Sequence, residues 1–486
     1  MVSEEKDSGV VAMMLVLQPR NRISQRDDLV KVMTTVNSCT PAEFELKIIR
    51  AKKAKQNIER RMSETKPAMV LEPGASIKPV IDEEGVKLLA ERLYGISVLE
   101  LIEMNGYDDK NYKIIEDPNV KNPLITNHCP NGYVLKIMNS MDSQNLSVVE
   151  AQNEIMNFLN TRSISCPKPI RNVYGHLYSV ESIGGKSHVV RLLEYLPGEL
   201  LKDVPKSEFL FYQAGEFIAT LDTTLQNFNH SGLVTREHIW MLSKVPELEK
   251  FKYVIKDAEK LDMAEEVMRY IIEIIKMAEE VIEEFKYAVV PRLGELEKGV
   301  IHGDFNEMNI LASPRPGSSA PTSCLPSISA PSVEICTNTA KIHELLRCGG
   351  RRWTRKNEYR VCGVLDFGDI QYSYYVFELA ITMTYMMLVS GDPRTGGLVL
   401  AGYTLNRRLP HDEYRLLKTL VSARLVQSLI LGAYTAEQDP KNTYVTSTEK
   451  ADGWGLLKKI RKTKYSPDEE DPTNWQKIAN DYLTKS

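Results

Sequence analysis

Residues 300–311 read VIHGDFNEMNIL, and this stretch decides the expected fold. Two apolar pairs, at 300–301 and 310–311, bracket a polar segment. That pattern is typical of two strands joined by a loop that carries function. Inside the loop, Asp304 and Asn309 are five positions apart. We therefore predict a strand, a functional loop and a second strand.

The spacing of Asp304 and Asn309 is that of the protein-kinase catalytic loop, where the Asp accepts the proton of the substrate hydroxyl and the Asn holds Mg²⁺. Here His302 and Gly303 precede Asp304, in place of the His-Arg-Asp of protein kinases. The missing Arg is the one that would bind an activation-loop phosphate, so the sequence predicts kinase chemistry without that switch.

A second motif follows at residues 363–369, which read GVLDFGD. It is an apolar strand ending in Asp-Phe-Gly, the pattern in which the Asp, here Asp366, bridges Mg²⁺ to the nucleotide phosphates. Each motif alone also fits a hydrophobic strand followed by a solvated turn. Both motifs in this order favour the functional interpretation.

The two motifs together resemble the aminoglycoside phosphotransferase-like (choline kinase-like) small-molecule kinases. Within that family, residues 190–198 (VRLLEYLPG), 300–311 and 365–378 are similar to the hydroxylysine kinase group. The resemblance runs from about residue 80 to 460. It implies an α+β, two-lobed protein kinase-like fold, with a small antiparallel sheet lobe that carries one helix, a hinge, and a larger, mostly helical lobe.

The resemblance also implies residue roles. Asp304 is expected to deprotonate the acceptor hydroxyl, and Asn309 and Asp366 are expected to hold Mg²⁺. His302 and Glu378 are expected to support the catalytic loop structurally.

Lys136 is expected to bind the nucleotide phosphates. It lies in the strand-like run YVLKI at 133–137, and a Lys buried among apolar residues needs an acidic partner. In kinases this partner is a Glu on the next helix. That helix is expected at 147–159, with Glu150 as the first choice and Glu154 as the second. The alternative is an edge-strand Lys that faces water.

By the same resemblance, the turn at 106–114, which includes Tyr107, covers the nucleotide phosphates. Backbone groups of Glu194, Tyr195 and Leu196 form the hinge that hydrogen-bonds the nucleotide base. Side chains at the hinge do not distinguish GTP from ATP.

The acceptor implied by the resemblance is 5-hydroxy-L-lysine, with GTP as phosphoryl donor. A cationic acceptor requires carboxylates beside it, and we expect Asp369 to supply one, with Asp108 and Asp109 as further candidates. Two alternatives remain open. One is the same chemistry on choline, ethanolamine, homoserine or methylthioribose. The other is an inactive kinase-like scaffold, although a scaffold does not need the four residues Lys136, Asp304, Asn309 and Asp366.

Length and composition indicate the general class of protein. A chain of 486 residues suits two lobes with additions, and 43% hydrophobic and 26% charged residues are typical of globular proteins. The net charge of −4 gives no indication of a nucleic-acid partner. The apolar run at 10–17 is too short to span a membrane. Seven scattered cysteines without a C-x-x-C pattern favour reduced thiols in the cytoplasm.

The expected domain organisation has five parts. Residues 1–78 form an N-terminal extension with a basic stretch at 42–61, 79–195 the small lobe, and 196–465 the large lobe. A Ser/Pro-rich insertion at 313–358 interrupts the large lobe, and 466–486 form a tail. The sequence leaves the oligomeric state open.

Overall fold

The computed structural model of this chain describes residues 77–125, 129–256, 265–315, 359–438, 446–462 and 470–485. Nearly all of the expected N-terminal extension and most of the expected insertion lie outside these ranges. Both lobes and the candidate site belong to one unit, Ala68–Phe285 with Leu296–Ser486, and Lys286–Glu295 fall in a second unit. Within the described ranges, no helix combines the length and the apolar character needed to cross a membrane.

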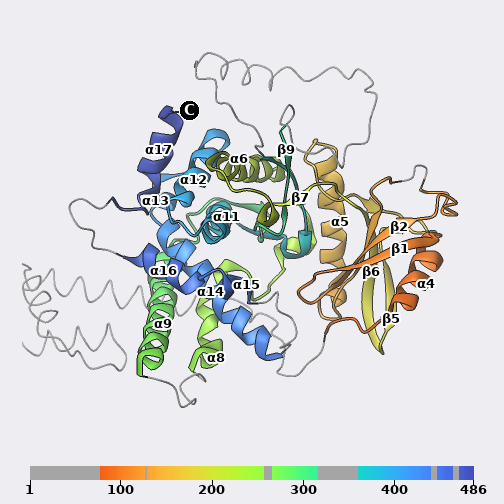
Figure 1. Ribbon diagram of the computed structural model, residues 1–486, viewed down its shortest axis with the longest axis horizontal. Helices are drawn as coiled ribbons and strands as arrows, with labels where there is room; N and C mark the ends of the chain where they lie inside the picture. The colour runs from red at the N-terminus through yellow and green to blue at the C-terminus, as the bar shows by residue number, and fades with distance from the viewer. Residues whose placement is uncertain are drawn as a thin grey trace, which may run out of the picture. The chain divides into compact units, whose positions relative to one another are not determined.

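The small lobe is built on a six-stranded antiparallel sheet in the order β1-β2-β3-β6-β4, with β5 also paired to β6 (Figure 1). Its elements are α4 (Glu83–Tyr94), β1 (Val98–Met104), β2 (Lys110–Glu116), β3 (Tyr133–Ile137), α5 (Leu146–Asn160), β4 (Pro169–Ile170), β5 (Ser179–Ile183) and β6 (Lys186–Glu194).

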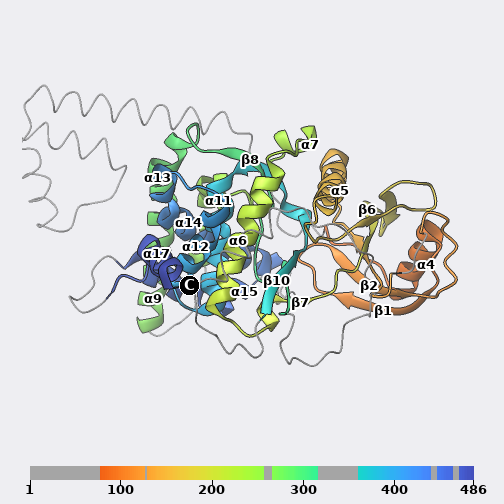
Figure 2. The same cartoon turned by 90° about the horizontal axis from the view of Figure 1, so that it is seen from above.

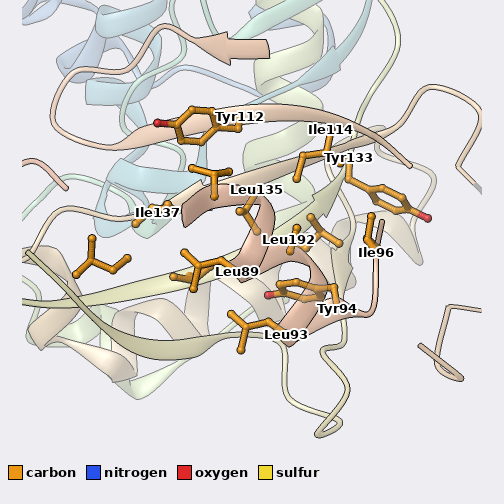
Figure 3. Close-up of a cluster of buried hydrophobic side chains, with 14 residues drawn as sticks. Leu89, Leu93, Tyr94, Ile96, Tyr112, Ile114, Tyr133, Leu135, Ile137 and Leu192 are labelled. Carbon is orange, nitrogen blue, oxygen red and sulfur yellow. The ribbon is translucent and has the colours of Figure 1, made fainter. Parts of the chain in front are cut away.

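Helix α4 covers one face of this sheet. Its N-cap Asp82 accepts a hydrogen bond from the Gly85 amide, which satisfies one of the free N–H groups of the first turn. Leu89 and Leu93 pack with the sheet residues in one buried cluster (Figure 3). Each fully buried leucine contributes about 1.5–3 kcal/mol to this core.

The alternation of side chains along β3 decides where Lys136 points. Leu135 and Ile137 belong to the cluster under α4, so Lys136 between them faces the opposite side of the sheet. Val149 of α5 packs on that opposite side, with Met138 and Val189. The strand pattern therefore carries the lysine toward the site while its neighbours build the core.

The large lobe is mostly helical. Its helices are α6 (Glu208–Leu225), α7 (Ser231–Val234), α8 (Tyr253–Lys256), α9 (Glu265–Glu284), α11 (Tyr375–Ser390), α12 (Thr395–Asn406), α13 (His411–Tyr414), α14 (Leu417–Gln438), α15 (Ser447–Lys450), α16 (Gly453–Arg461) and α17 (Trp475–Lys485). Its strands are β7 (Glu199–Leu200), β8 (Lys298–Ile301), β9 (Ile310–Pro314), β10 (Tyr359–Val364) and β11 (Gln371–Tyr374).

Two glycines allow α6 and α12 to lie backbone against backbone beside α11 (Figures 1 and 2). A Cβ atom on Gly215 of α6 would lie 1.9 Å from the Val399 carbonyl oxygen of α12. A Cβ atom on Gly402 would lie equally close to the Tyr212 carbonyl oxygen. Any larger residue would push the helices apart.

The strands on either side of the catalytic loop do not pair with each other. β8 pairs with β11, while β9 pairs with β10 and β7. The loop 302–309 therefore lies between two small antiparallel pairs, and the same pairs carry the segment 365–370 next to it. The strand–loop–strand prediction is confirmed.

The large lobe extends past its expected boundary at residue 465. Residues 470–485 were expected in the tail, but they include α17, whose Trp475 is 1% exposed. Its indole N–H donates to the Pro393 carbonyl at 2.8 Å. Buried aromatic area with a satisfied N–H attaches this helix firmly to the lobe.

Candidate active site

Asp304 is held by three donors, two from the catalytic loop and one from α14. Its Oδ2 accepts hydrogen bonds from the side-chain amides of Asn306 and Asn309, both at 2.9 Å. Its Oδ1 accepts from the Arg424 Nη2 at 3.0 Å. The Asn309 amide nitrogen also donates to the Asp304 carbonyl, so the loop that separates the two residues is closed on itself.

His302 connects this loop to the strand that precedes Asp366. Its Nε2 lies 2.9 Å from the Leu365 carbonyl, and its Nδ1 accepts from the Asp304 amide. Both contacts require the neutral ring with the proton on Nε2. Burial lowers the pKa of His302 although nearby carboxylates oppose that shift, which keeps the ring neutral. The structure thus shows the anchoring hydrogen bonds that were expected for this residue.

Gly303 explains why this loop differs from His-Arg-Asp. Its φ angle is +83°, and a Cβ atom there would lie 2.5 Å from the Asp369 carbonyl oxygen. Only glycine adopts this backbone region without strain and fits this approach. The absence of the arginine therefore has a steric reason.

Lys136 and Asp366 form an ion pair across the two lobes. The Lys136 Nζ lies 3.3 Å from the Asp366 Oδ1, and Arg191 is the register neighbour of Lys136 on β6. Burial raises the pKa of Asp366, but Lys136 and Arg191 lower it more, so the net shift is downward. Asp366 is therefore kept ionised. It adopts a left-handed backbone, with its carboxylate accepting from the Gly368 amide.

The second partner of Lys136 is Asp109, which corrects the expectation of Glu150. The Asp109 Oδ2 lies 3.0 Å from the Lys136 Nζ. Helix α5 was expected correctly, but its packing turns Glu150 away, and this carboxylate accepts from the Tyr178 hydroxyl. Gln152 of the same helix instead donates to the Gly368 carbonyl. The second choice, Glu154, lies 3.8 Å from His230.

Tyr107, in the turn expected to cover the nucleotide phosphates, contacts the large lobe. Its hydroxyl donates to the Thr435 side chain at 2.6 Å, and its ring meets Trp240 edge-on with centroids 5.8 Å apart. Asp108 follows it in the loop and is half-buried. The loop residue that reaches Lys136 is Asp109.

The hinge segment already uses two of its amides. The Glu194 amide donates to the Lys168 carbonyl, and the Tyr195 amide donates to the Gly132 carbonyl. A nucleotide base at this segment has to use its remaining backbone groups. Leu196 packs near Gly363 of β10, so the hinge touches the strand that leads to Asp366.

Asp369 lies in a charged cluster beside Asp304. Its carboxylate is 3.7 Å from the His238 Nδ1. Burial and the neighbouring Asp304 raise the pKa of Asp369 to about 7, although Arg236 and Arg424 act in the opposite direction. Burial, together with these two arginines, lowers the pKa of His238 well below its usual value, so His238 is neutral.

Three residues of the site were not expected from the sequence in the roles the structure gives them: Asp109, Arg236 and Arg424. Arg236 donates to the carbonyls of both Gly368 and Ile370, which fixes the turn after Asp366. The sequence carries a signal for Arg424 alone, because this residue interrupts an apolar run. The structure places it on α14, where it is 1% exposed. Buried arginines are rare unless they are paired.

The residues fit a divalent metal of the magnesium type. In the described part of the chain, no group of three or more His, Cys, Asp or Glu side chains is arranged to hold a metal. Mg²⁺ does not require one, because it uses one or two carboxylates together with phosphate oxygens and water. An ionised Asp366 and the Asn309 amide oxygen, whose nitrogen is turned toward Asp304, are ligands of that kind.

Comparisons with known proteins show the family to which the chain belongs. Residues 105–319 match the model of the phosphotransferase enzyme family. The hydroxylysine kinase of Xenopus laevis is 33% identical over 396 residues, which cover 79% of this chain and 90% of that protein. The Bos taurus hydroxylysine kinase is 31% identical over 395 residues, with 79% and 91% covered.

A solved structure shows the same fold. An amicoumacin kinase in complex with AMP-PNP and Ca²⁺ superposes with a TM-score of 0.50 at 14% identity, and covers 78% of this chain and 93% of its own.

The two-lobed fold and the family match define a small-molecule kinase, a phosphotransferase that acts on an alcohol group with a nucleotide as donor. More narrowly, the chain belongs to the hydroxylysine kinase family within the phosphotransferase enzyme family.

Proposed function

We propose that this chain transfers the γ-phosphoryl group of GTP to the hydroxyl of 5-hydroxy-L-lysine. The observation that carries the proposal is the linked arrangement of Asp304, Asn309, Lys136 and Asp366, in which each polar group is fixed by a partner. The acceptor comes from the relatives named hydroxylysine kinase, and GTP as donor comes only from the resemblance described above.

Asp304 is the proposed base. The acceptor oxygen forms a bond to the γ-phosphorus, the bond from that phosphorus to the β-phosphate bridging oxygen breaks, and GDP leaves. The hydroxyl proton passes to the Asp304 carboxylate. Its Oδ2 already accepts two amide hydrogen bonds, so Oδ1 is the oxygen that receives the acceptor hydroxyl. Catalysis of this kind depends mainly on positioning and charge.

Asn309 and Asp366 are proposed to hold Mg²⁺. When bound, the metal supplies positive charge along the phosphate oxygens. Lys136 lies 3.3 Å from Asp366 and is placed to add a second positive charge to the same phosphates. His302 and Glu378 hold the loop backbone, and Glu194, Tyr195 and Leu196 remain the proposed region for the base of the nucleotide.

Asp369 is the proposed partner of the acceptor side-chain ammonium, with Asp108 as a further candidate. In 5-hydroxylysine the ammonium is on the carbon next to the one that bears the hydroxyl. An acceptor hydroxyl at Asp304 therefore brings this ammonium close to Asp369, whose pKa Asp304 already raises. A bound cation relieves that repulsion between the two carboxylates.

The domain boundaries at residues 78 and 195 stay part of this proposal, and the large lobe is proposed to continue past residue 465 through α17. A cytoplasmic location is also part of the proposal.

The test is a phosphorylation assay with purified chain, Mg²⁺ and either GTP or ATP. The acceptors are 5-hydroxylysine, lysine, homoserine, choline and ethanolamine. We expect GTP-dependent transfer to 5-hydroxylysine and no transfer to lysine. Asp304→Asn is expected to lower kcat by about 10²–10⁴-fold, the usual range for loss of a general base.

Two measurements decide between alternatives. Transfer to another acceptor keeps the residue roles and removes the acceptor assignment. Binding of nucleotide with no transfer to any acceptor favours a scaffold. Nucleotide binding is read from the rise in melting temperature, since a ligand that binds only the folded state stabilises it. Asp304→Asn should keep that rise.

A further inference from the structure

Arg424 is a buried cation in direct contact with the proposed catalytic base. It lies on α14, is 1% exposed, and its Nη2 donates to the Asp304 Oδ1 at 3.0 Å. Its Nη1 donates to the Trp240 carbonyl and to the Gln427 side chain, both at 3.1 Å. These three contacts fix the plane of the guanidinium.

The guanidinium has donors left over. An arginine carries five N–H groups; the contacts above use three of them, and the Tyr385 hydroxyl is a further hydrogen-bond partner of the guanidinium. The Nε is buried and has no hydrogen-bond partner among the described residues. A buried N–H without a partner is destabilising, so such a group requires an explanation. The His238 Nε2 in the same cluster is also buried without a partner in this part of the chain.

The geometry also fixes which side of Asp304 the acceptor uses. Two amides occupy Oδ2, so the acceptor hydroxyl and Arg424 share Oδ1. An acceptor that binds there lies beside the guanidinium whatever its remaining structure.

We propose that Arg424 determines acceptor specificity by binding the α-carboxylate of an amino-acid acceptor through its unused Nε–H. This inference rests on the proposed function. In 5-hydroxylysine the carboxyl carbon is four bonds from the carbon that bears the hydroxyl, so one molecule can reach both Asp304 and its neighbour Arg424. Choline and ethanolamine have no carboxylate and cannot make this contact.

Arginine suits this task because its planar donor groups match a carboxylate and it stays charged when buried. The half-buried Trp240 lies over the guanidinium, 5.4 Å from its ring centroid. The negative charge of the carboxylate is offset by the side-chain ammonium that the acceptor carries to Asp369, and the α-ammonium remains as one net positive charge.

The test compares two acceptors that differ only in the carboxylate: 5-hydroxylysine and 1,5-diaminopentan-2-ol. For the wild type we expect kcat/KM to be about 10- to 100-fold higher for 5-hydroxylysine, the range of a hydrogen bond to a charged group. For Arg424→Gln this ratio should fall to near one, with most of the loss on 5-hydroxylysine appearing in KM.

The outcomes distinguish failure of the inference about Arg424 from failure of the proposed function. An equal loss on both acceptors means that Arg424 only positions Asp304, and it overturns the inference. A wild-type ratio near one overturns it as well. Failure of the wild type to phosphorylate either acceptor overturns the proposed function and the inference with it.

Arg424→Lys serves if the Gln variant does not fold, and it is expected to keep only part of the ratio. Arg415→Gln, at an exposed position near the start of the same helix, is the matched control and should change neither acceptor.

Discussion

The Gly303 amide donates a 2.7 Å hydrogen bond to the Glu378 Oε2. This bond joins the residue before the proposed base to the first turn of α11. Glu378 is 0% exposed, and burial raises its pKa to about 7. The nearby Asp304 acts in the same direction, while the bond from Gly303 opposes it. A buried carboxyl near neutrality therefore supports the backbone of the catalytic loop.

The raised pKa of Glu378 predicts how stability depends on pH. Between its usual value of 4.5 and about 7 the folded chain binds a proton that the unfolded chain has released. The free energy of unfolding should therefore fall as pH rises through this window. Glu378→Gln should flatten this part of the curve, measured by thermal unfolding in EDTA. The exposed Glu84→Gln is the control, and an unchanged slope in the Glu378 variant contradicts the assignment.

Gly303→Ala should damage both stability and activity. A left-handed backbone costs a non-glycine residue about 1–2 kcal/mol. The added Cβ also meets the Asp369 carbonyl at 2.5 Å, so Asp304 has to move. Gly185→Ala is the matched control, since its φ is +77° with no atom within 4 Å of the added Cβ. We expect urea denaturation to show a larger loss of unfolding free energy for Gly303→Ala than for Gly185→Ala. Only Gly303→Ala is expected to lower kcat. Equal losses at both positions would falsify the steric argument.

The resemblance of the two motifs to those of kinases was enough to predict Asp304, Asn309 and Asp366 as parts of one site, and the short apolar strands that bound each motif predicted their loops. The same holds for Lys136, whose strand alternates strictly between the two faces. The antiparallel small lobe and the helical large lobe followed from the order of these parts.

The partner of Lys136 could not be predicted, because it depends on the rotation of α5 about its axis. Val149 and Met156 face inward and are at most 1% exposed, which turns Glu150 outward. The spacing of residues in the sequence does not determine how α5 is rotated about its axis. Arg236 and Arg424 come from segments far away in the chain, and only tertiary packing brings them to the site.

Arg236→Gln should raise the Mg²⁺ concentration needed for half-maximal activity. Arg236 donates to the Gly368 carbonyl at 2.6 Å and also to the Ile370 carbonyl, so it fixes the turn that follows Asp366. Loss of such support around metal ligands typically weakens metal binding about 10-fold or more. Arg171→Gln is the control, because Arg171 also donates to a backbone carbonyl but belongs to an exposed turn of the small lobe. A shift in kcat without a shift in the Mg²⁺ midpoint contradicts this role.

Asp109→Asn should strengthen nucleotide binding. Asp109 lies 3.0 Å from the Lys136 ammonium and so pairs with the cation that we propose binds the phosphates. The Asn139 amide holds this carboxylate in place at 2.7 Å. Removing its charge leaves Lys136 paired with Asp366 alone and takes a negative charge away from the phosphates. We expect the Kd for GTP to fall about 10-fold, equivalent to about 1.4 kcal/mol, in calorimetric titration.

The control for this variant is Glu103→Gln. Glu103 pairs with Lys110 at 2.6 Å in the neighbouring part of the same hairpin, without contact to Lys136. It should leave the Kd unchanged. A higher Kd for GTP in Asp109→Asn would mean that Asp109 holds Lys136 in its binding geometry rather than competing with the phosphates for it. The ammonium released from its carboxylate would then be less well placed for the phosphates. The direction of the change therefore decides between competition and positioning.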